Sequence, residues 1–209
     1  MLTIWGRPTA FNAQKVVWAA EEVGIPYERI DAGTKWGVVD TPEYRRLNPN
    51  GLVPVIQDGD YVLWESNTIV RYLSGKYGRN DLYPADFLTR IEAERWMDWQ
   101  ATHVLPAHKA AFQYAVRNIG TLEQAQASFE QTNALFAILD AALATKPYVA
   151  GNHFTMGDIP IGSLAYRWYS MDWAAIPRMP HLQDWYARVT ARPSFDAIRR
   201  LPKDGQRVG

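Results

Sequence analysis

The sequence Gly51-Leu52-Val53-Pro54-Val55-Ile56 decides the fold, because it has the apolar character of a β-strand but carries a proline near its start. Proline has no N–H and is excluded from central strands, so Pro54 fits best at the head of a strand, where Val53 stays unpaired. The bond before a proline is also the one peptide bond whose cis form costs little, about 0.5–1 kcal/mol. A cis bond here would turn the N–H and C=O of Val53 outward, as an open edge for an extended peptide.

A second motif, Glu65-Ser66-Asn67, follows at the start of an apolar-periodic helix. A helix N-terminus favours a carboxylate, because its first N–H groups have no partner and its dipole is positive there. Taken alone, the first motif is a tight turn and the second an ordinary helix cap. Their order and spacing together predict a site that holds a small acidic peptide.

The composition excludes several classes of protein. The 209 residues have zero net charge and 47% apolar residues, so we expect a sizeable core and no nucleic-acid surface. We find no apolar run of the roughly 18 residues that a membrane helix needs. The segment Met1–Trp5 reads as a first strand and not as a signal peptide, so we expect a cytoplasmic location. The chain has no cysteine, and any thiol chemistry must use the thiol of a ligand.

Two styles of sequence follow one another along the chain. The first 80 residues alternate between strand and helix patterns. The first three expected elements, a strand, a helix and a strand, form a βαβ unit. The expected elements here are strands at Leu2–Trp5 and Tyr27–Ile30, helices at Asn12–Val23 and Ser66–Tyr77, and a hairpin around Asp58-Gly59-Asp60. Asn12 is expected to cap the first helix.

Everything after the polar stretch 79–84 reads as helix. We expect one helix over Phe87–His103 that Pro106 ends or kinks, and a long helix over Leu122–Leu143. A capping box variant at Thr155–Asp158 opens a helix through Trp168. The polar tail from Leu201 is expected to be loose. The fold class is therefore an α/β domain followed by an all-α domain, with boundaries at 1–80, a linker at 81–86 and a helical domain at 87–209.

These motifs together resemble a cytosolic glutathione transferase of a bacterial type, over essentially the whole chain. The residues that carry the resemblance are Trp5-Gly6-Arg7, Asn12, Gln14-Lys15-Val16-Val17, Glu21 to Tyr27, Leu47-Asn48-Pro49-Asn50-Gly51, Val53-Pro54-Val55-Ile56, Glu65 to Ile69 and Thr155 to Asp158. The resemblance implies a thioredoxin-like first domain, an all-helical second domain, a homodimer and a role in detoxification. It names the small acidic peptide as glutathione.

The resemblance also implies roles for four residues of the two motifs. The backbone of Val53 would pair with the cysteinyl part of glutathione, and Pro54 would be the cis proline of the family. Ser66 would take the γ-glutamyl carboxylate at the helix start, and Glu65 would face the ammonium group.

The group that activates the sulfur is a departure from the family pattern. A free thiol with a pKa near 8.5 is mostly protonated at neutral pH, so a donor or a helix N-terminus must stabilise the thiolate. Many family members use a tyrosine, serine or cysteine at the first strand–helix junction, and residues 6 to 15 contain none of these. Ala10 lies where the hydroxyl is expected. The remaining candidates are Asn12, as an amide donor, and Thr9, or the helix N-terminus alone.

A second departure concerns the glycine carboxylate of glutathione. Many relatives carry a basic residue immediately before the Val-Pro pair, where this chain has Leu52. The cation must then come from Lys35, from Arg7 or from the partner subunit.

The pocket for the second substrate is expected between the two domains. Large aromatics at helical spacing are also typical of a core, so both roles stay open for them. The pocket residues that we expect are Phe11, Trp99, His103, Ala107, Tyr114 and Tyr166. The histidines at 103, 108, 153 and 181 show no metal-ligand spacing, so we expect no metal.

Three functions are compatible with these residues. The first is attack of the glutathione thiolate on a hydrophobic electrophile such as an aryl halide, epoxide or isothiocyanate. The second is glutathione-dependent disulfide exchange or peroxide reduction without a protein cysteine. The third is a ligand-binding protein without activity, which the missing hydroxyl at Ala10 supports.

Overall fold

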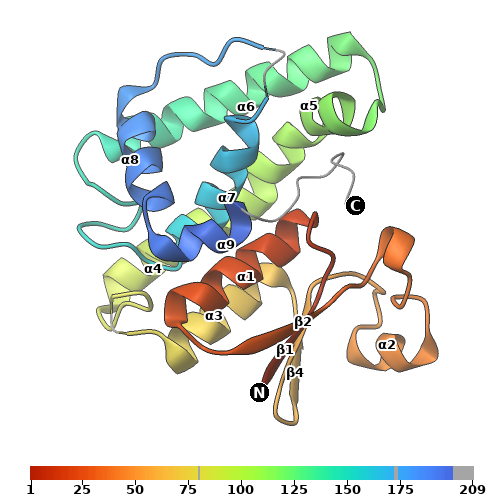
Figure 1. The fold of residues 1–209 in the computed structure, drawn as a ribbon. Coiled ribbons are helices and arrows are strands. Elements are labelled where there is room, and N and C mark those ends of the chain that lie inside the picture. Colours follow the sequence, from red (N-terminus) through yellow and green to blue (C-terminus); the bar gives the residue numbers. More distant parts are fainter. Residues whose placement is uncertain (80, 172–173, 200–209) are drawn as a thin grey trace. The chain divides into compact units, whose positions relative to one another are not determined.

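The computed structural model of the chain describes residues 1–79, 81–171 and 174–199, so the tail from Leu201 lies outside the described residues. The chain forms two compact units. The first comprises Met1–Tyr83 together with the segment that begins at Pro193, and the second comprises Pro84–Arg192. Figure 1 shows the ribbon of both units with their elements labelled.

The first unit is built on a four-stranded mixed sheet. Its strands are β1 (Leu2–Trp5), β2 (Tyr27–Ile30), β3 (Val55–Asp58) and β4 (Tyr61–Trp64), in the order β2-β1-β3-β4. β1 is parallel to β2 and antiparallel to β3, and β3 is antiparallel to β4. The predicted βαβ unit and the hairpin are both confirmed, because alternating apolar residues and the Asp58-Gly59 turn are strong local signals.

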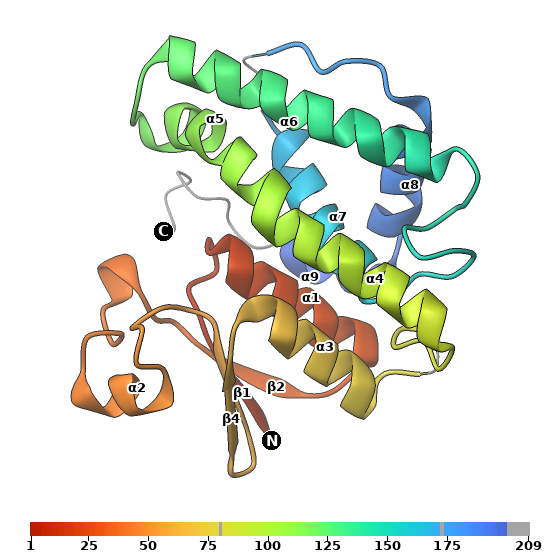
Figure 2. The ribbon, with the colours of Figure 1, turned by 180° about the vertical axis from the view of Figure 1, so that it is seen from behind.

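Two helices lie side by side on one face of this sheet, as Figures 1 and 2 both show. They are α1 (Phe11–Val23) and α3 (Ser66–Tyr77). α1 ends at Gly24, whose φ of 70° is the left-handed conformation that favours glycine at this position. The short helix α2 (Pro42–Leu47) and a 3-10 turn (Thr34–Trp36) lie in the connection between β2 and β3.

Residues 193–199 pack against α1. They contain a 3-10 turn (Pro193–Phe195) and the short helix α9 (Asp196–Arg199). The indole N–H of Trp18 donates to the hydroxyl of Ser194 at 3.1 Å, and its ring meets that of Phe195 edge-on at 4.9 Å. These residues were assigned to the helical domain from the sequence. They belong to the first unit because they bury Trp18.

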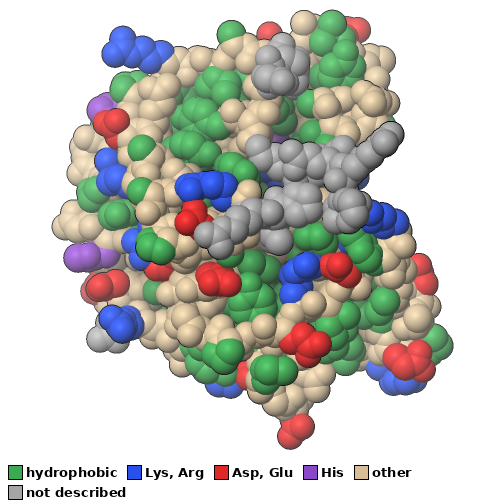
Figure 3. Space-filling view, viewed as in Figure 1, with side chains coloured by type: hydrophobic (Ala, Val, Ile, Leu, Met, Phe, Trp, Pro, Cys, Tyr) green, Lys and Arg blue, Asp and Glu red, His purple; other side chains and the backbone are tan. Residues whose placement is uncertain are grey.

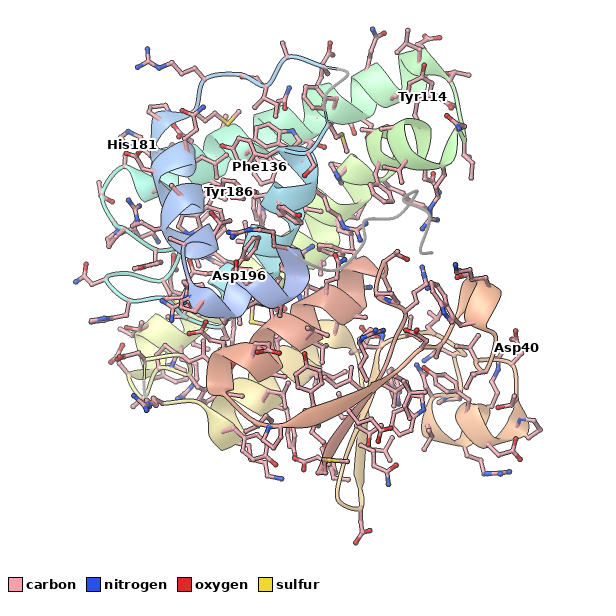
Figure 4. All side chains as sticks on the ribbon, in the orientation of Figure 1. Asp40, Tyr114, Phe136, His181, Tyr186 and Asp196 are labelled. Atoms are coloured by element: carbon pink, nitrogen blue, oxygen red, sulfur yellow. The ribbon has the colours of Figure 1, made fainter. Side chains whose placement is uncertain are left out.

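The second unit is all-helical. Its elements are α4 (Phe87–Trp99), a π-helical segment (Gln100–Val104), α5 (Leu105–Arg117), α6 (Leu122–Leu143), α7 (Asp158–Trp168) and α8 (Pro180–Thr190). α5 and α6 pack along each other, as Figure 2 shows. Phe136 of α6 lies in the interior of this unit (Figure 4), with its ring 4.6 Å from that of Trp168.

The helix from Phe87 does not end near Pro106, which was one of the two outcomes expected at this proline. The helix passes through a π turn, in which the N–H of Leu105 donates to the carbonyl of Gln100, and continues to Arg117. Pro106 lies in the first turn of α5, where a missing N–H is tolerated. The sequence shows the proline but contains no signal for the π turn that precedes it.

The start of α7 is held by a buried carboxylate. The fully buried carboxylate of Asp158 accepts from the backbone N–H of Val149 at 3.1 Å and of Thr155 at 2.9 Å. It also accepts from the hydroxyl of Thr155 at 3.2 Å and the indole N–H of Trp185 at 2.8 Å. The predicted helix through Trp168 is confirmed. Only half of the predicted capping box forms, because the hydroxyl of Thr155 accepts from the N–H of Gly157 and not from that of Asp158, and Gly157 is the N-cap of α7.

Charged side chains of both signs are interspersed on the face drawn in Figure 3, in keeping with the zero net charge of the chain. Among the described residues, none of the helices combines the length and the apolar character that crossing a bilayer requires.

Candidate active site

The register of the sheet brings three chain segments of the first unit to one edge. Val55 at the start of β3 pairs with Trp5 at the end of β1 and with Trp64 at the end of β4. The residues next to these three positions, just outside the strands, therefore lie close together. They are Gly6 to Thr9 after β1, Leu52 to Pro54 before β3, and Glu65 to Asn67 after β4.

The bond between Val53 and Pro54 is cis, as the sequence predicted. Pro54 is buried and directly precedes β3, which is the position that a proline can occupy in a sheet. Neither the N–H nor the C=O of Val53 hydrogen-bonds to another described residue. An extended peptide could therefore pair with this backbone.

Two side chains fix the loop that carries Val53. The phenol of Tyr44 and the amide nitrogen of Asn48 both donate to the carbonyl oxygen of Leu52, each at 2.8 Å. Burial raises the pKa of Tyr44 to about 12, so its hydroxyl stays protonated and able to donate. The side chain of Leu52 itself is 65% exposed. The Leu47-Asn48-Pro49-Asn50-Gly51 motif thus holds the backbone that presents Val53.

The N-cap residue of α3 does not cap the first turn of the helix. Glu65 occupies that position with a φ of 73°, and its side chain makes no hydrogen bond to the helix. Left-handed φ values are uncommon outside glycine and cluster at binding and catalytic sites, where the surroundings hold them in place. Ser66, the first helical residue, is 7% exposed. Both residues lie at the start of α3, as the sequence predicted.

Asn12 does not cap α1, contrary to the prediction. The N-cap is Ala10, which makes no side-chain hydrogen bond, and the helix begins at Phe11. The side-chain oxygen Oδ1 of Asn12 is buried and has no hydrogen-bond partner among the described residues. Thr9 precedes the cap and is 7% exposed. A buried amide oxygen without a partner is costly, so a ligand group at this point would satisfy it.

The structure separates the two candidate cations for the glycine carboxylate. A Cβ atom added to Gly33 would lie 3.2 Å from Nη1 of Arg7 and 3.7 Å from the side chain of Val53, so the guanidinium lies close to Val53. Lys35 is exposed on the 3-10 turn, with its ammonium 4.6 Å from the ring centroid of Trp36.

The sequence analysis missed one residue of this region, Lys15. It lies on α1 with 1% of its surface exposed, and its ammonium donates to Oδ1 of Asn67 at 2.8 Å. Burial lowers the pKa of Lys15 to about 7, an effect that the nearby carboxylate of Glu65 opposes. A lysine one turn after Phe11 and one turn before Ala19, in the apolar stripe of α1, is the signal that could have revealed it.

The residues expected to line the second-substrate pocket divide between the units. Phe11 is buried at the start of α1 in the first unit. In the second unit, Trp99, His103, Ala107 and Tyr114 follow one side of α4, the π segment and α5, and Tyr166 lies on α7. Tyr114 is labelled in Figure 4. Trp99 packs edge-on against Trp96 at 5.0 Å, which is a core contact.

The histidines of α5 and the π segment differ in environment. His103 is exposed and contacts the hydroxyl of Thr102 at 2.8 Å. His108 is 2% exposed, and burial together with the nearby Arg167 lowers its pKa to about 3. No group of three His, Cys, Asp or Glu side chains in the described part of the chain is arranged to hold a metal ion.

Comparison with known proteins gives a consistent result for both units. The family model for the N-terminal domain of glutathione S-transferases matches residues 12–75, and the model for the C-terminal domain matches residues 104–193. The chain belongs to the glutathione S-transferase family. It is thus a glutathione transferase with a thioredoxin-like first unit, and glutathione is its co-substrate.

Individual relatives match over nearly the full length. Glutathione S-transferase GstB of Escherichia coli K12 is 40% identical over 207 residues, which cover 97% of this chain and 99% of the relative. Glutathione S-transferase 3 of Zea mays is 31% identical and covers 93% and 91%. The theta class glutathione S-transferase of Xanthomonas axonopodis pv. citri, solved with glutathione bound, is 43% identical, with a TM-score of 0.91 over 98% of this chain and 99% of that one.

Proposed function

We propose that the chain binds glutathione along the edge formed by Val53, Glu65 and Ser66, and directs its thiolate at a small hydrophobic electrophile. The observation that carries this proposal is the backbone of Val53, whose N–H and C=O have no partner among the described residues. Val55 pairs with Trp64, so the segment that carries Val53 and the one that carries Ser66 both leave the sheet from this pair. A tripeptide with an extended cysteinyl residue and an anionic end can therefore engage both.

Each end of glutathione then has its own partner. The γ-glutamyl carboxylate takes the hydroxyl of Ser66 and the first N–H groups of α3, and the carboxylate of Glu65 faces the ammonium group. The glycine carboxylate takes Arg7, whose guanidinium lies close to Val53. Lys35, exposed on its turn, and the partner subunit are the alternatives for this last role.

The sulfur would lie near the start of α1, with Asn12 as its polar neighbour. An amide offers an acceptor oxygen and a donor nitrogen that exchange places by a half-turn about χ2. The nitrogen can donate to the thiolate, and the positive end of the α1 dipole stabilises the same charge. The thiolate then forms a sulfur–carbon bond with the electrophile, while a halide leaves or an epoxide ring opens. Thr9 is the rival donor.

Residues of both units are proposed to contact the electrophile. They are Phe11, Trp99, His103, Ala107, Tyr114 and Tyr166. The proposal includes a homodimer and a cytoplasmic location, in keeping with a cysteine-free chain that uses the thiol of a small molecule. Light scattering at micromolar concentration checks the dimer, and an active, stable monomer of 23.8 kDa would contradict it.

A glutathione titration by calorimetry, followed by turnover assays, tests the function. The assays use an aryl halide, an epoxide, an isothiocyanate and a low-molecular-weight disulfide. We expect saturable binding of glutathione and conjugate formation with at least one electrophile. Turnover of the disulfide alone would favour glutathione-dependent disulfide exchange. Binding without any turnover would favour a ligand-binding protein, and the absence of binding would contradict the proposal.

A further inference from the structure

Lys15 is a buried ammonium group with little to neutralise it. It lies on α1 facing α3, is 1% exposed, and donates one hydrogen bond, to Asn67 Oδ1 at 2.8 Å. An ammonium has three donors, and Asn67 is the only hydrogen-bond partner of Lys15 among the described residues. The ring of Phe11, 5.1 Å from the nitrogen, adds a weak cation–π contact.

The stability of the fold does not account for this charge. Removing an ammonium from water is costly unless a counter-charge and full hydrogen bonding compensate. Burial is accordingly the main cause of the lowered pKa of Lys15. The carboxylate of Glu65 opposes that effect, and the guanidinium of Arg71 adds to it. An unbranched apolar side chain of similar length would pack between α1 and α3 without that cost.

Lys15 contacts the start of α3 through Asn67. Asn67 is the second residue of that helix and follows Ser66 directly. Because an ammonium can only donate, its bond to Oδ1 fixes which end of the Asn67 amide faces α1 and directs the Nδ2 group elsewhere. The charge also attracts Glu65, the residue held at a φ of 73°.

We propose that Lys15 is a positioning residue for the γ-glutamyl group of glutathione, acting through Asn67 and the start of α3. It holds the amide of Asn67 in one orientation and adds positive charge close to the point where the γ-glutamyl carboxylate binds. This inference rests on the proposed function, since it assumes that glutathione binds at the start of α3.

The test uses S-methylglutathione, whose sulfur cannot ionise, so that binding is measured apart from thiolate formation. Calorimetry at pH 6.5 compares the wild-type chain with Lys15→Met and Lys15→Arg. We expect Lys15→Met to weaken binding about tenfold or more, the scale of one lost charge-assisted hydrogen bond, and Lys15→Arg to restore part of it. The thermal midpoint of Lys15→Met is expected to equal or exceed that of the wild type.

A truncated ligand and a second variant separate positioning from a structural role. S-methylcysteinylglycine lacks the γ-glutamyl group, so its weaker binding should not change in Lys15→Met. Asn67→Ala should reproduce the loss for S-methylglutathione, and the double variant should be no weaker than either single one, because the two residues act as a unit.

Three outcomes would overturn the inference. Equal binding of S-methylglutathione by wild type and Lys15→Met would remove any role for the charge. A lower thermal midpoint, with equal losses for both ligands, would make Lys15 structural. No binding of S-methylglutathione by the wild-type chain would overturn the proposed function, and this inference with it.

Discussion

The first turns of α3 and α7 each carry a carboxylate, and they use it in opposite ways. At α7 the carboxylate of Asp158 is fully buried and accepts four hydrogen bonds from three separate segments of its own unit. At α3 the carboxylate of Glu65 caps nothing, and the residue has a left-handed φ. A helix end that is satisfied by its own chain stabilises the fold, whereas one that is left open can take a ligand. Asp158→Ala and Ser66→Ala test this contrast directly, and changes at Asn12 and His108 extend the tests to α1 and α5.

The largest expected effect is on α7. Asp158→Ala leaves the N–H groups of Val149, Thr155 and Trp185 without their acceptor in a buried site, and should lower the free energy of unfolding by about 3–5 kcal/mol. Urea unfolding followed by tryptophan fluorescence measures the loss. Asp158→Asn, which keeps one acceptor oxygen, is the matched control and should lose less. A loss below about 1 kcal/mol for the alanine variant would contradict the structural role.

The second effect is on catalysis. If Asn12 donates to the sulfur, Asn12→Ala should lower turnover at neutral pH by about 10²-fold, the scale for one lost donor to an anion. Turnover should recover in part at high pH, where the thiol ionises unaided. An ultraviolet titration of the bound thiolate should show a raised pKa, with glutathione binding mostly intact.

Thr9→Ala is the control for Asn12→Ala, because Thr9 carries the nearest rival hydroxyl. If Thr9→Ala removes the thiolate signal while Asn12→Ala leaves it, the two roles are reversed. If neither change matters, the N-terminus of α1 alone activates the sulfur.

The third effect is on binding at α3. Ser66→Ala should weaken glutathione binding by roughly 1–3 kcal/mol, the range for an unmet hydrogen bond to a charged group. The free energy of unfolding should barely change, in contrast with Asp158→Ala. Calorimetry measures the affinity for glutathione, and urea unfolding measures the free energy of unfolding. Unchanged affinity would show that Ser66 does not hold the carboxylate.

The smallest effect is a pH dependence of stability in the helical unit. The pKa of His108 is lowered by burial and then by Arg167 to about 3, so between about pH 6.5 and 3 only the unfolded chain binds this proton. The contribution of His108 to stability is therefore complete above pH 6.5 and falls as the pH drops. At pH 5 the loss amounts to about 1–2 kcal/mol relative to pH 8.

His108→Phe removes this proton site, so the variant should lose less stability between pH 8 and pH 5 than the wild type does. Unfolding curves at both pH values give the comparison. If the two proteins lose the same amount, then His108 does not titrate differently in the folded and unfolded states.

Local signals account for most of the fold that was predictable from the sequence. Leu2–Trp5, Tyr27–Ile30 and Ser66–Tyr77 matched the observed elements, because their apolar spacing is regular and Gly78 follows the helix. Pro106 does not end its helix, and the π turn before it was not predictable, since that turn depends on packing and not on residue type. The contact of Ser194 and Phe195 with Trp18 was not predictable for the same reason, because it joins residues far apart in the sequence.

Some features of the candidate site were also predictable from single residues, and others were not. The cis bond before Pro54 and the position of Ser66 at a helix start followed from single residues and were confirmed. Asn12 was wrongly expected to cap α1, because nothing in the sequence shows that Ala10 takes that position without a side-chain bond. Lys15 was missed because a lone lysine in a helix is usually solvated, and only the packing of α1 against α3 buries it.

The segment that begins at Pro193 also bears on how the chain is made. Phe195 and Ile198, each 1% exposed, belong to the unit that starts at Met1, yet the ribosome adds them after all of Pro84–Arg192. Domains generally fold as units while synthesis proceeds from the N-terminus. In this chain the helical unit is complete in sequence before the unit that precedes it, so the first unit must wait, with Trp18 uncovered, until Phe195 and Ile198 have been added.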